Sequence, residues 1–180
     1  KYAPCNADGA IDEKAYRGYI QWVLKKGVHA VALNAGADFD YNDAERRRMA
    51  EILLEEVNGK VPTIVGAQAW DTETCIKRAR EVEKLGADVV FITGPPLTRP
   101  LSGNSKDIAE HFKRISDVVH IPISFYNTPG AWPGIMSPEI LKTIEKAAPN
   151  VTYMKAGERE FQEYEKNFNG MADRKIKFIS

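Results

Sequence analysis

Short apolar strands alternate with amphipathic helices along almost the whole chain, and this rhythm restricts the fold more than any other feature. The helical pattern over 13–26 stops at Gly27, an apolar run over 28–33 follows, and the same unit then repeats. Seven strands are expected, over 2–4, 28–33, 60–65, 87–93, 120–126, 151–155 and 175–179. Six helices are expected, over 13–26, 42–57, 71–85, 106–118, 138–147 and 159–168. Such alternation predicts an α/β protein with a parallel sheet buried on both faces.

Two architectures fit this alternation, an open doubly wound sheet and a closed (βα)8 TIM barrel. A doubly wound nucleotide-binding protein should carry a glycine-rich turn after an early strand, but Asn34-Ala35-Gly36-Ala37-Asp38 matches neither GxGxxG nor GxxxxGK[ST]. The barrel is therefore favoured. Because seven strands cannot close an eight-stranded barrel, we expect one barrel domain over 1–180, incomplete at the N-terminus and after the seventh strand.

The composition limits the classes of partner. The 180 residues carry 25 basic and 25 acidic side chains, which gives no electrostatic reason to expect nucleic acid or an anionic membrane as a partner. The run Arg46-Arg47-Arg48 lies among glutamates in a helical pattern and is interpreted as a solvated helix face. No apolar run approaches the roughly 20 residues that a membrane-spanning helix needs.

The cysteines and histidines give no sign of a metal or disulfide framework. Two cysteines stand seventy positions apart without a CxxC motif, which suits a reducing compartment and favours the cytoplasm. Three histidines occur singly, without cysteine or carboxylate neighbours at ligand spacing, so we expect no metal site.

Two ionisable residues end neighbouring predicted strands. Tyr126 ends the strand over 120–126 and Lys155 ends the strand over 151–155, with one βαβ unit between them. Parallel neighbours lie about 4.8 Å apart, so we expect the phenol and the amine to lie close together at the carboxyl edge of the sheet. Burial disfavours the charged form of an amine and leaves it nucleophilic, as a Schiff-base lysine requires.

Each of the two residues also has an ordinary structural interpretation. A lysine can extend from a strand end into solvent, and a tyrosine can pack in a core with its hydroxyl on a backbone carbonyl. Their joint position at adjoining strand ends favours a catalytic pair in which Lys155 is the nucleophile.

Several segments, taken in order, resemble the dihydrodipicolinate synthase and N-acetylneuraminate lyase family over nearly the whole chain. They are Ala3-Pro4-Cys5 before a polar stretch, Gly86-Ala87-Asp88 before a strand, Tyr126-Asn127-Thr128-Pro129, and Met154-Lys155. No single segment is specific, but the ordered set is.

The resemblance implies a lysine-dependent class I aldolase or dehydratase on a (βα)8 barrel that acts on a 2-oxo acid without a cofactor. Lys155 would form the Schiff base and Tyr126 would relay protons. Near the substrate carboxylate the resemblance places the loop Asn34, Ala35, Gly36 and Ala37, whose backbone amides could bind an anion. Family members are often homotetramers, so a homotetramer is a possible assembly.

Three departures from the family pattern bear on the reaction. The loop Asn34 to Asp38 carries no hydroxyl, whereas the family loop commonly reads Gly-Thr-Thr-Gly-Glu. Pro95-Pro96-Leu97 stands where many members have Pro-Tyr-Tyr. Ala131-Trp132 stands where dihydrodipicolinate synthases have a substrate-binding arginine. These differences argue against dihydrodipicolinate synthase itself. The first expectation is a lyase that acts on a 2-oxo acid through a lysine Schiff base. A dehydratase of a 2-oxo-3-deoxy sugar acid and a non-catalytic barrel paralogue stay open as alternatives.

Overall fold

The computed structural model describes residues 3–33, 41–94, 105–127, 136–157, 161–171 and 175–179. The described strands are β1 (Val31–Leu33), β2 (Thr63–Gly66), β3 (Val89–Ile92), β4 (Ile123–Asn127), β5 (Val151–Ala156) and β6 (Lys177–Ile179). They form one parallel sheet in chain order, from β1 to β6. A doubly wound sheet reverses its strand order at a switch point, so this uninterrupted order is that of a barrel wall.

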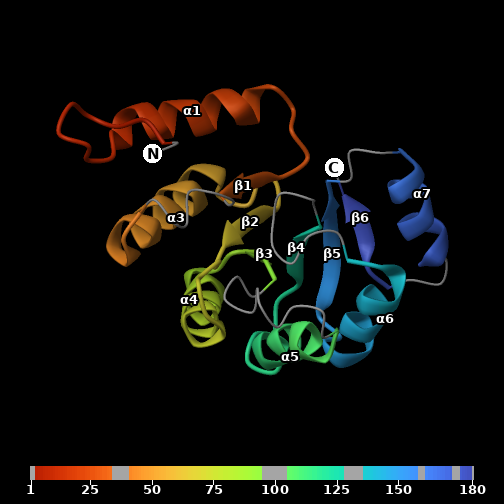
Figure 1. The fold of residues 1–180 in the computed structure, drawn as a ribbon. Helices are drawn as coiled ribbons and strands as arrows, with labels where there is room; N and C mark the ends of the chain where they lie inside the picture. The colour runs from red at the N-terminus through yellow and green to blue at the C-terminus, as the bar shows by residue number, and fades with distance from the viewer. Residues whose placement is uncertain are drawn as a thin grey trace.

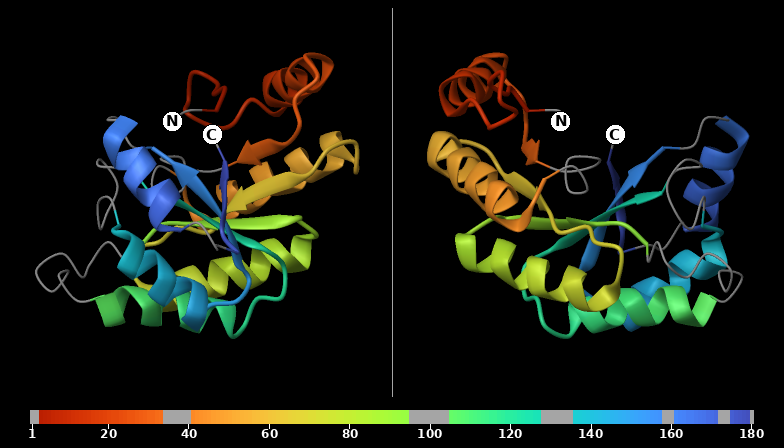
Figure 2. Two further views of the ribbon diagram at one scale, coloured as in Figure 1. Left: turned by 90° about the vertical axis from the view of Figure 1, so that its right-hand side faces the viewer. Right: turned by 60° about the vertical axis from the view of Figure 1, so that its left-hand side comes forward.

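The helices cover the outer side of this curved sheet. They are α1 (Glu13–Lys25), α3 (Asp43–Val57), α4 (Thr72–Leu85), α5 (Ser105–Ser116), α6 (Pro138–Ala147) and α7 (Phe161–Gly170). Figure 1 shows α3 to α7 following one another around the strands, with α1 beside α3 at one end of the row, and Figure 2 shows the opposite side of the sheet open. The described part is thus a half-barrel. Within it, no helix combines the length and the apolarity needed to cross a membrane.

Local signals set the helix ends. The Asn42 side chain accepts from Glu45 N at 2.9 Å while the Glu45 carboxylate accepts from Asn42 N at 3.0 Å, which completes the expected capping box of α3. Asp71 caps α4 through Thr74 N at 2.8 Å. Gly86 ends α4 at a φ of 92°, in the left-handed region where glycine carries no side-chain penalty.

The strand expected over 2–4 is wrong where it can be checked. Ala3 and Pro4 are not in a strand, and Cys5 instead forms an isolated antiparallel bridge with Ile11. Ala3 N donates to the Tyr41 hydroxyl at 2.8 Å, and proline has no N–H with which to join a ladder. The described residues therefore contain six strands, where the sequence predicts seven; the other six predictions each contain an observed strand core.

The two faces of the sheet differ. Outward side chains such as Val90, Ile92 and Phe125 are fully buried against the helices, and the Phe125 ring meets Phe112 of α5 with centroids 5.1 Å apart. The inner face lines an open cavity of about 570 Å³ because six strands do not close on themselves.

The amino ends of the strands are fixed by carboxylates. Glu83 accepts from His120 N at 2.7 Å and from Ile121 N at 3.2 Å, at the start of β4. Glu145 repeats the arrangement two units later, where it accepts from the backbone N–H groups of Lys175 and Ile176 before β6. These hydrogen bonds satisfy backbone N–H groups that lie before the first paired residues of the strands and have no partner in the parallel sheet.

Candidate active site

Tyr126 and Lys155 face each other near the carboxyl ends of β4 and β5. They are direct partners in the register of the two strands. The Nζ atom of Lys155 lies 4.8 Å from the centroid of the Tyr126 ring, a distance at which the ring face attracts an ammonium group. The sequence prediction that the amine and the phenol meet at this edge is confirmed.

A β-bulge sets the side of the sheet to which Lys155 points. Ile123 pairs with Val151, but the next residue, Ser124, pairs with Tyr153, so Thr152 is an extra residue in β5. Val151 and Met154 are therefore both buried in the outer core although three positions separate them. Strict alternation from Val151 would turn position 155 outward; the bulge returns Lys155 to the inner face beside Tyr126.

The expectation that Lys155 is buried is wrong for this structure. Its side chain is exposed, although Phe91 and Ser124 on the same inner face are buried. The side chain lines the cavity of about 570 Å³ together with Ile64, Phe91, Ser124 and Tyr153. This volume is within the range of small-molecule sites.

Asn127 is a site residue that the sequence prediction did not identify. It is fully buried, its Oδ1 accepts from Met136 N at 2.8 Å, and its carbonyl accepts from Gly157 N at 2.8 Å. It thereby ties the chain beyond β4 and the chain beyond β5 to the strand end that carries Tyr126. A polar residue that directly follows an apolar run was the available signal.

The loop Asn34, Ala35, Gly36 and Ala37 lies outside the described residues. Beside the flanks of this loop, Leu33 and Tyr41 line a pocket of about 20 Å³ between α3 and α4. That volume holds about one water molecule and is too small for a 2-oxo acid. The larger cavity that Lys155 lines is therefore the candidate substrate site.

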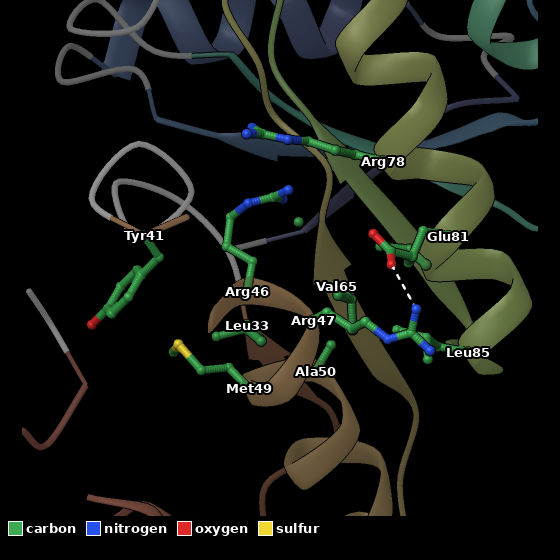
Figure 3. Close-up of a pocket in the computed structure, with 12 residues that line it drawn as sticks. Leu33, Tyr41, Arg46, Arg47, Met49, Ala50, Val65, Arg78, Glu81 and Leu85 are labelled. Atoms are coloured by element: carbon green, nitrogen blue, oxygen red, sulfur yellow. Dashed lines mark hydrogen bonds and ion pairs between the residues drawn. The ribbon is translucent and has the colours of Figure 1, made fainter. Parts of the chain in front are cut away.

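Two arginines converge beside that small pocket, and one of them corrects a prediction. Figure 3 shows the guanidinium groups of Arg46 and Arg78 entering the same space from α3 and α4. Arg46 is only 8 % exposed, so it does not belong to a solvated helix face. Arg47 agrees with the prediction: it is exposed and pairs with Glu51 at 2.9 Å.

A carboxylate neutralises part of this arginine charge. Asp43 Oδ1 accepts from Arg46 at 2.6 Å and from Arg78 at 3.1 Å, and Arg78 also donates to the Gln68 carbonyl. The hydrogen bond from Arg46, followed by that from Arg78, lowers the pKa of Asp43. The cluster links α3 and α4 to the chain that follows β2. In the described ranges, no three His, Cys, Asp or Glu side chains gather to hold a metal ion.

Known proteins share both the sequence pattern and the fold. The family model described as the dihydrodipicolinate synthetase family matches residues 2–178. The 4-hydroxy-tetrahydrodipicolinate synthase of Brucella abortus is 31 % identical over 154 residues, which cover 84 % of this chain and 52 % of that protein. The chain thus spans about half the length of the curated relatives it matches.

Solved structures of dihydrodipicolinate synthases have the same fold as this chain. Dihydrodipicolinate synthase from Thermotoga maritima superposes with a TM-score of 0.84 at 26 % identity, over 98 % of this chain and 61 % of the other. The enzyme from Acinetobacter baumannii, solved in complex with pyruvate, gives a TM-score of 0.86 at 20 % identity, over 98 % of this chain and 60 % of the other. On these grounds, and with the half-barrel and its lysine-bearing strand in view, the chain belongs to the dihydrodipicolinate synthetase family.

Proposed function

We propose that the protein is a class I lyase that cleaves or joins a carbon–carbon bond of a 2-oxo acid through a Schiff base on Lys155. The observation that carries this proposal is the pairing of Lys155 with Tyr126 on the inner face of the sheet, 4.8 Å from Nζ to ring centroid. Lys155 lines a cavity of about 570 Å³, which is large enough for a small acid.

The lysine supplies the covalent step. The neutral amine of Lys155 attacks the ketone carbon of the 2-oxo acid, and the carbinolamine loses water to give a protonated imine. When the carbon–carbon bond breaks, its electron pair moves into the imine and yields an enamine, which a proton then quenches. Condensation with an aldehyde is the reverse sequence.

Tyr126 moves the protons in this scheme. Its phenol would protonate the departing hydroxyl of the carbinolamine and take a proton when the aldehyde forms, provided that it comes within hydrogen-bond reach of the substrate. In the structure the amine lies over the ring face, so rotation of the lysine side chain would bring the imine carbon toward the hydroxyl.

The wider scaffold is proposed from the sequence and the relatives. The closed eight-stranded barrel would desolvate the amine, and one barrel domain would include residues 1–180. Backbone amides in Asn34 to Ala37 would bind the substrate carboxylate. Pyruvate is the first 2-oxo acid to test because a protein of the same fold was solved with pyruvate. A homotetramer stays a prediction.

Borohydride trapping tests the proposal directly. The full-length protein is incubated with pyruvate and borohydride, and peptide mass spectrometry locates the reduced adduct. We expect the adduct on Lys155, and none in Lys155→Arg, which keeps the charge but not the nucleophile. Lys177→Arg is the matched control, because Lys177 lies on the neighbouring strand β6, where it pairs with Tyr153 and not with Lys155. Absence of an adduct with pyruvate and other small 2-oxo acids, or its persistence in Lys155→Arg, would contradict the proposal and favour a non-catalytic barrel.

A further inference from the structure

Asn127 connects the ends of the two strands that carry the candidate catalytic pair. It directly follows Tyr126 on β4, and its side-chain Oδ1 accepts from Met136 N at 2.8 Å. Its backbone carbonyl accepts from Gly157 N, also at 2.8 Å, and Gly157 lies two residues after Lys155. One residue therefore binds both the chain that leads into α6 and the chain that leaves β5.

The Asn127 side chain lies on the outer face of the sheet, opposite to the tyrosine and the lysine. Side chains two apart on a strand point to the same face, so Asn127 shares the face of Phe125, whose ring packs against Phe112 of α5. Asn127 is fully buried, and Met136 is buried as well. Because a buried backbone N–H without an acceptor costs free energy, the amide oxygen of Asn127 fixes the Met136 backbone to the strand end.

These contacts restrict the backbone on which the catalytic pair stands. Tyr126 has a fully buried residue on either side, Phe125 before it and Asn127 after it. The end of β5 is less enclosed, because Lys155 is exposed and the two residues after it are only partly buried. The hydrogen bond from Gly157 N to the Asn127 carbonyl therefore holds this strand end beside β4.

We propose that Asn127 is a positioning residue that keeps the Tyr126 phenol and the Lys155 amine opposite each other. Its side-chain bond to Met136 N orients the Asn127 peptide, and the carbonyl of that peptide holds the end of β5 through Gly157 N. Asn127 thus acts on the pair through the backbone, from the outer face of the sheet. The effect on the reaction rests on the proposed function, whereas the effect on the backbone does not.

Amide hydrogen exchange in the full-length protein tests the effect on the backbone. We expect the N–H groups of Met136 and Gly157 to exchange slowly in the wild type and faster in Asn127→Ala. Asn127→Asp keeps an acceptor oxygen close to the start of α6, where a helix favours negative charge, and should keep Met136 N–H protected. Unchanged exchange of both N–H groups in Asn127→Ala would overturn the proposal.

The rate of borohydride trapping with pyruvate tests the effect on the reaction. In Asn127→Ala we expect the rate constant at saturating pyruvate to fall about tenfold, because a 1 Å misplacement of reacting groups can cost about 10²-fold. The pyruvate concentration that gives half of this rate should not change. A purely structural residue would reduce the fraction of protein that is trapped and leave the rate constant unchanged. Asn127→Asp should return the rate constant toward that of the wild type.

Asn150 provides a matched control at the opposite ends of the same two strands. Its side-chain amide donates to the carbonyls of Val119 and Ile121, and its own carbonyl accepts from Ile123 N at 2.7 Å. Asn150→Ala therefore removes comparable side-chain bonds to the backbone at the amino ends of β4 and β5. We expect it to lower the midpoint of thermal unfolding and to leave the rate constant of trapping unchanged.

Failure of this proposal and failure of the proposed function give different results. If the wild-type protein forms no adduct, the proposed function fails and the positioning role fails with it. If the wild type forms the adduct and Asn127→Ala forms it with the same rate constant, the positioning role is overturned and the lyase proposal stands. An equal fall of the rate constant in Asn127→Ala and Asn150→Ala would also overturn the positioning role, because a general loss of stability would then explain both.

Discussion

The two ends of the sheet use polar side chains in opposite ways. At the amino ends, Glu83 and Glu145 each bind two consecutive backbone N–H groups of a strand start. At the carboxyl ends of β4 and β5, Tyr126 and Lys155 contact each other, and Lys155 lines a cavity. Barrel proteins commonly separate stability and chemistry in this manner, one at each end of the strands. Mutations of Tyr126 or Lys155 and mutations of Glu83 or Glu145 should therefore change different measured quantities.

The largest expected effect is on the reaction and comes from the carboxyl end. Tyr126→Phe removes the hydroxyl and keeps the ring that the Lys155 amine faces. We expect the turnover of the full-length protein to fall by about 10²–10⁴, the usual contribution of general acid–base catalysis, with little change in the free energy of unfolding. A Tyr126→Phe protein with undiminished turnover would show that another group carries the proton.

A second carboxyl-end group should make stability depend on pH. His111 of α5 is buried; its Nε2 lies 3.1 Å from the Thr93 carbonyl beyond β3, and its Nδ1 lies 2.9 Å from the Thr72 hydroxyl. A carbonyl only accepts, so Nε2 carries the proton and Nδ1 accepts from Thr72. Burial, and to a smaller extent Arg114, lowers the pKa of His111 to about 4.

The sign of the effect follows from the lowered pKa. Between about pH 6.5 and pH 4, His111 is protonated in the unfolded chain but neutral in the folded protein. The stability contributed by neutral His111 is therefore complete above pH 6.5 and is lost as the pH falls to 4. We expect a loss of about 3 kcal/mol in urea unfolding across this window. His111→Gln should flatten this part of the curve.

Removing an amino-end carboxylate should reduce stability alone. Glu83→Ala leaves His120 N and Ile121 N without their acceptor, and we expect a loss of about 1–2 kcal/mol in the free energy of unfolding. Glu83→Gln retains a carbonyl acceptor and should lose less. The rate of borohydride trapping of Lys155 with pyruvate should be unchanged in both variants. A slower reaction would show that the amino-end carboxylate also affects the chemistry at the carboxyl end.

The smallest expected effect concerns Asn42, the exposed N-cap of α3, which lies at the carboxyl side of the sheet. Asn42→Ala removes the side chain that accepts from Glu45 N and should cost about 1 kcal/mol in urea unfolding. Asn42→Asp keeps the acceptor and serves as the control. If Asn42→Ala and Asn42→Asp lower the free energy of unfolding by the same amount, loss of the cap hydrogen bond is not the cause.

Helices were predictable from the sequence because their ends are marked locally. Asn42 with Glu45, Asp71 and Gly86 each act within a few residues of the helix end that they set. The range expected for α6, Pro138–Ala147, is the observed one. Strand starts were less predictable: Val28 extends the apolar run before β1, yet pairing begins at Val31 because only there does the chain lie beside β2.

Features that depend on distant partners could not be predicted. The burial of Arg46 depends in part on Arg78 of another helix, which shares Asp43 with it. The inward direction of Lys155 was reached from strand-end position alone, without knowledge of the bulge. Nothing in Val151-Thr152-Tyr153 marks Thr152 as the extra residue, because a bulge exists only relative to the partner strand.

The bulge has a consequence for how sequences in this family are aligned. Since β5 absorbs one surplus residue without turning its lysine away from the tyrosine, we expect a homologue that lacks this residue to keep its lysine on the same face. An alignment should therefore be anchored on the lysine, with the gap placed at Thr152. Spacing measured from the helix would otherwise place this lysine in the wrong column.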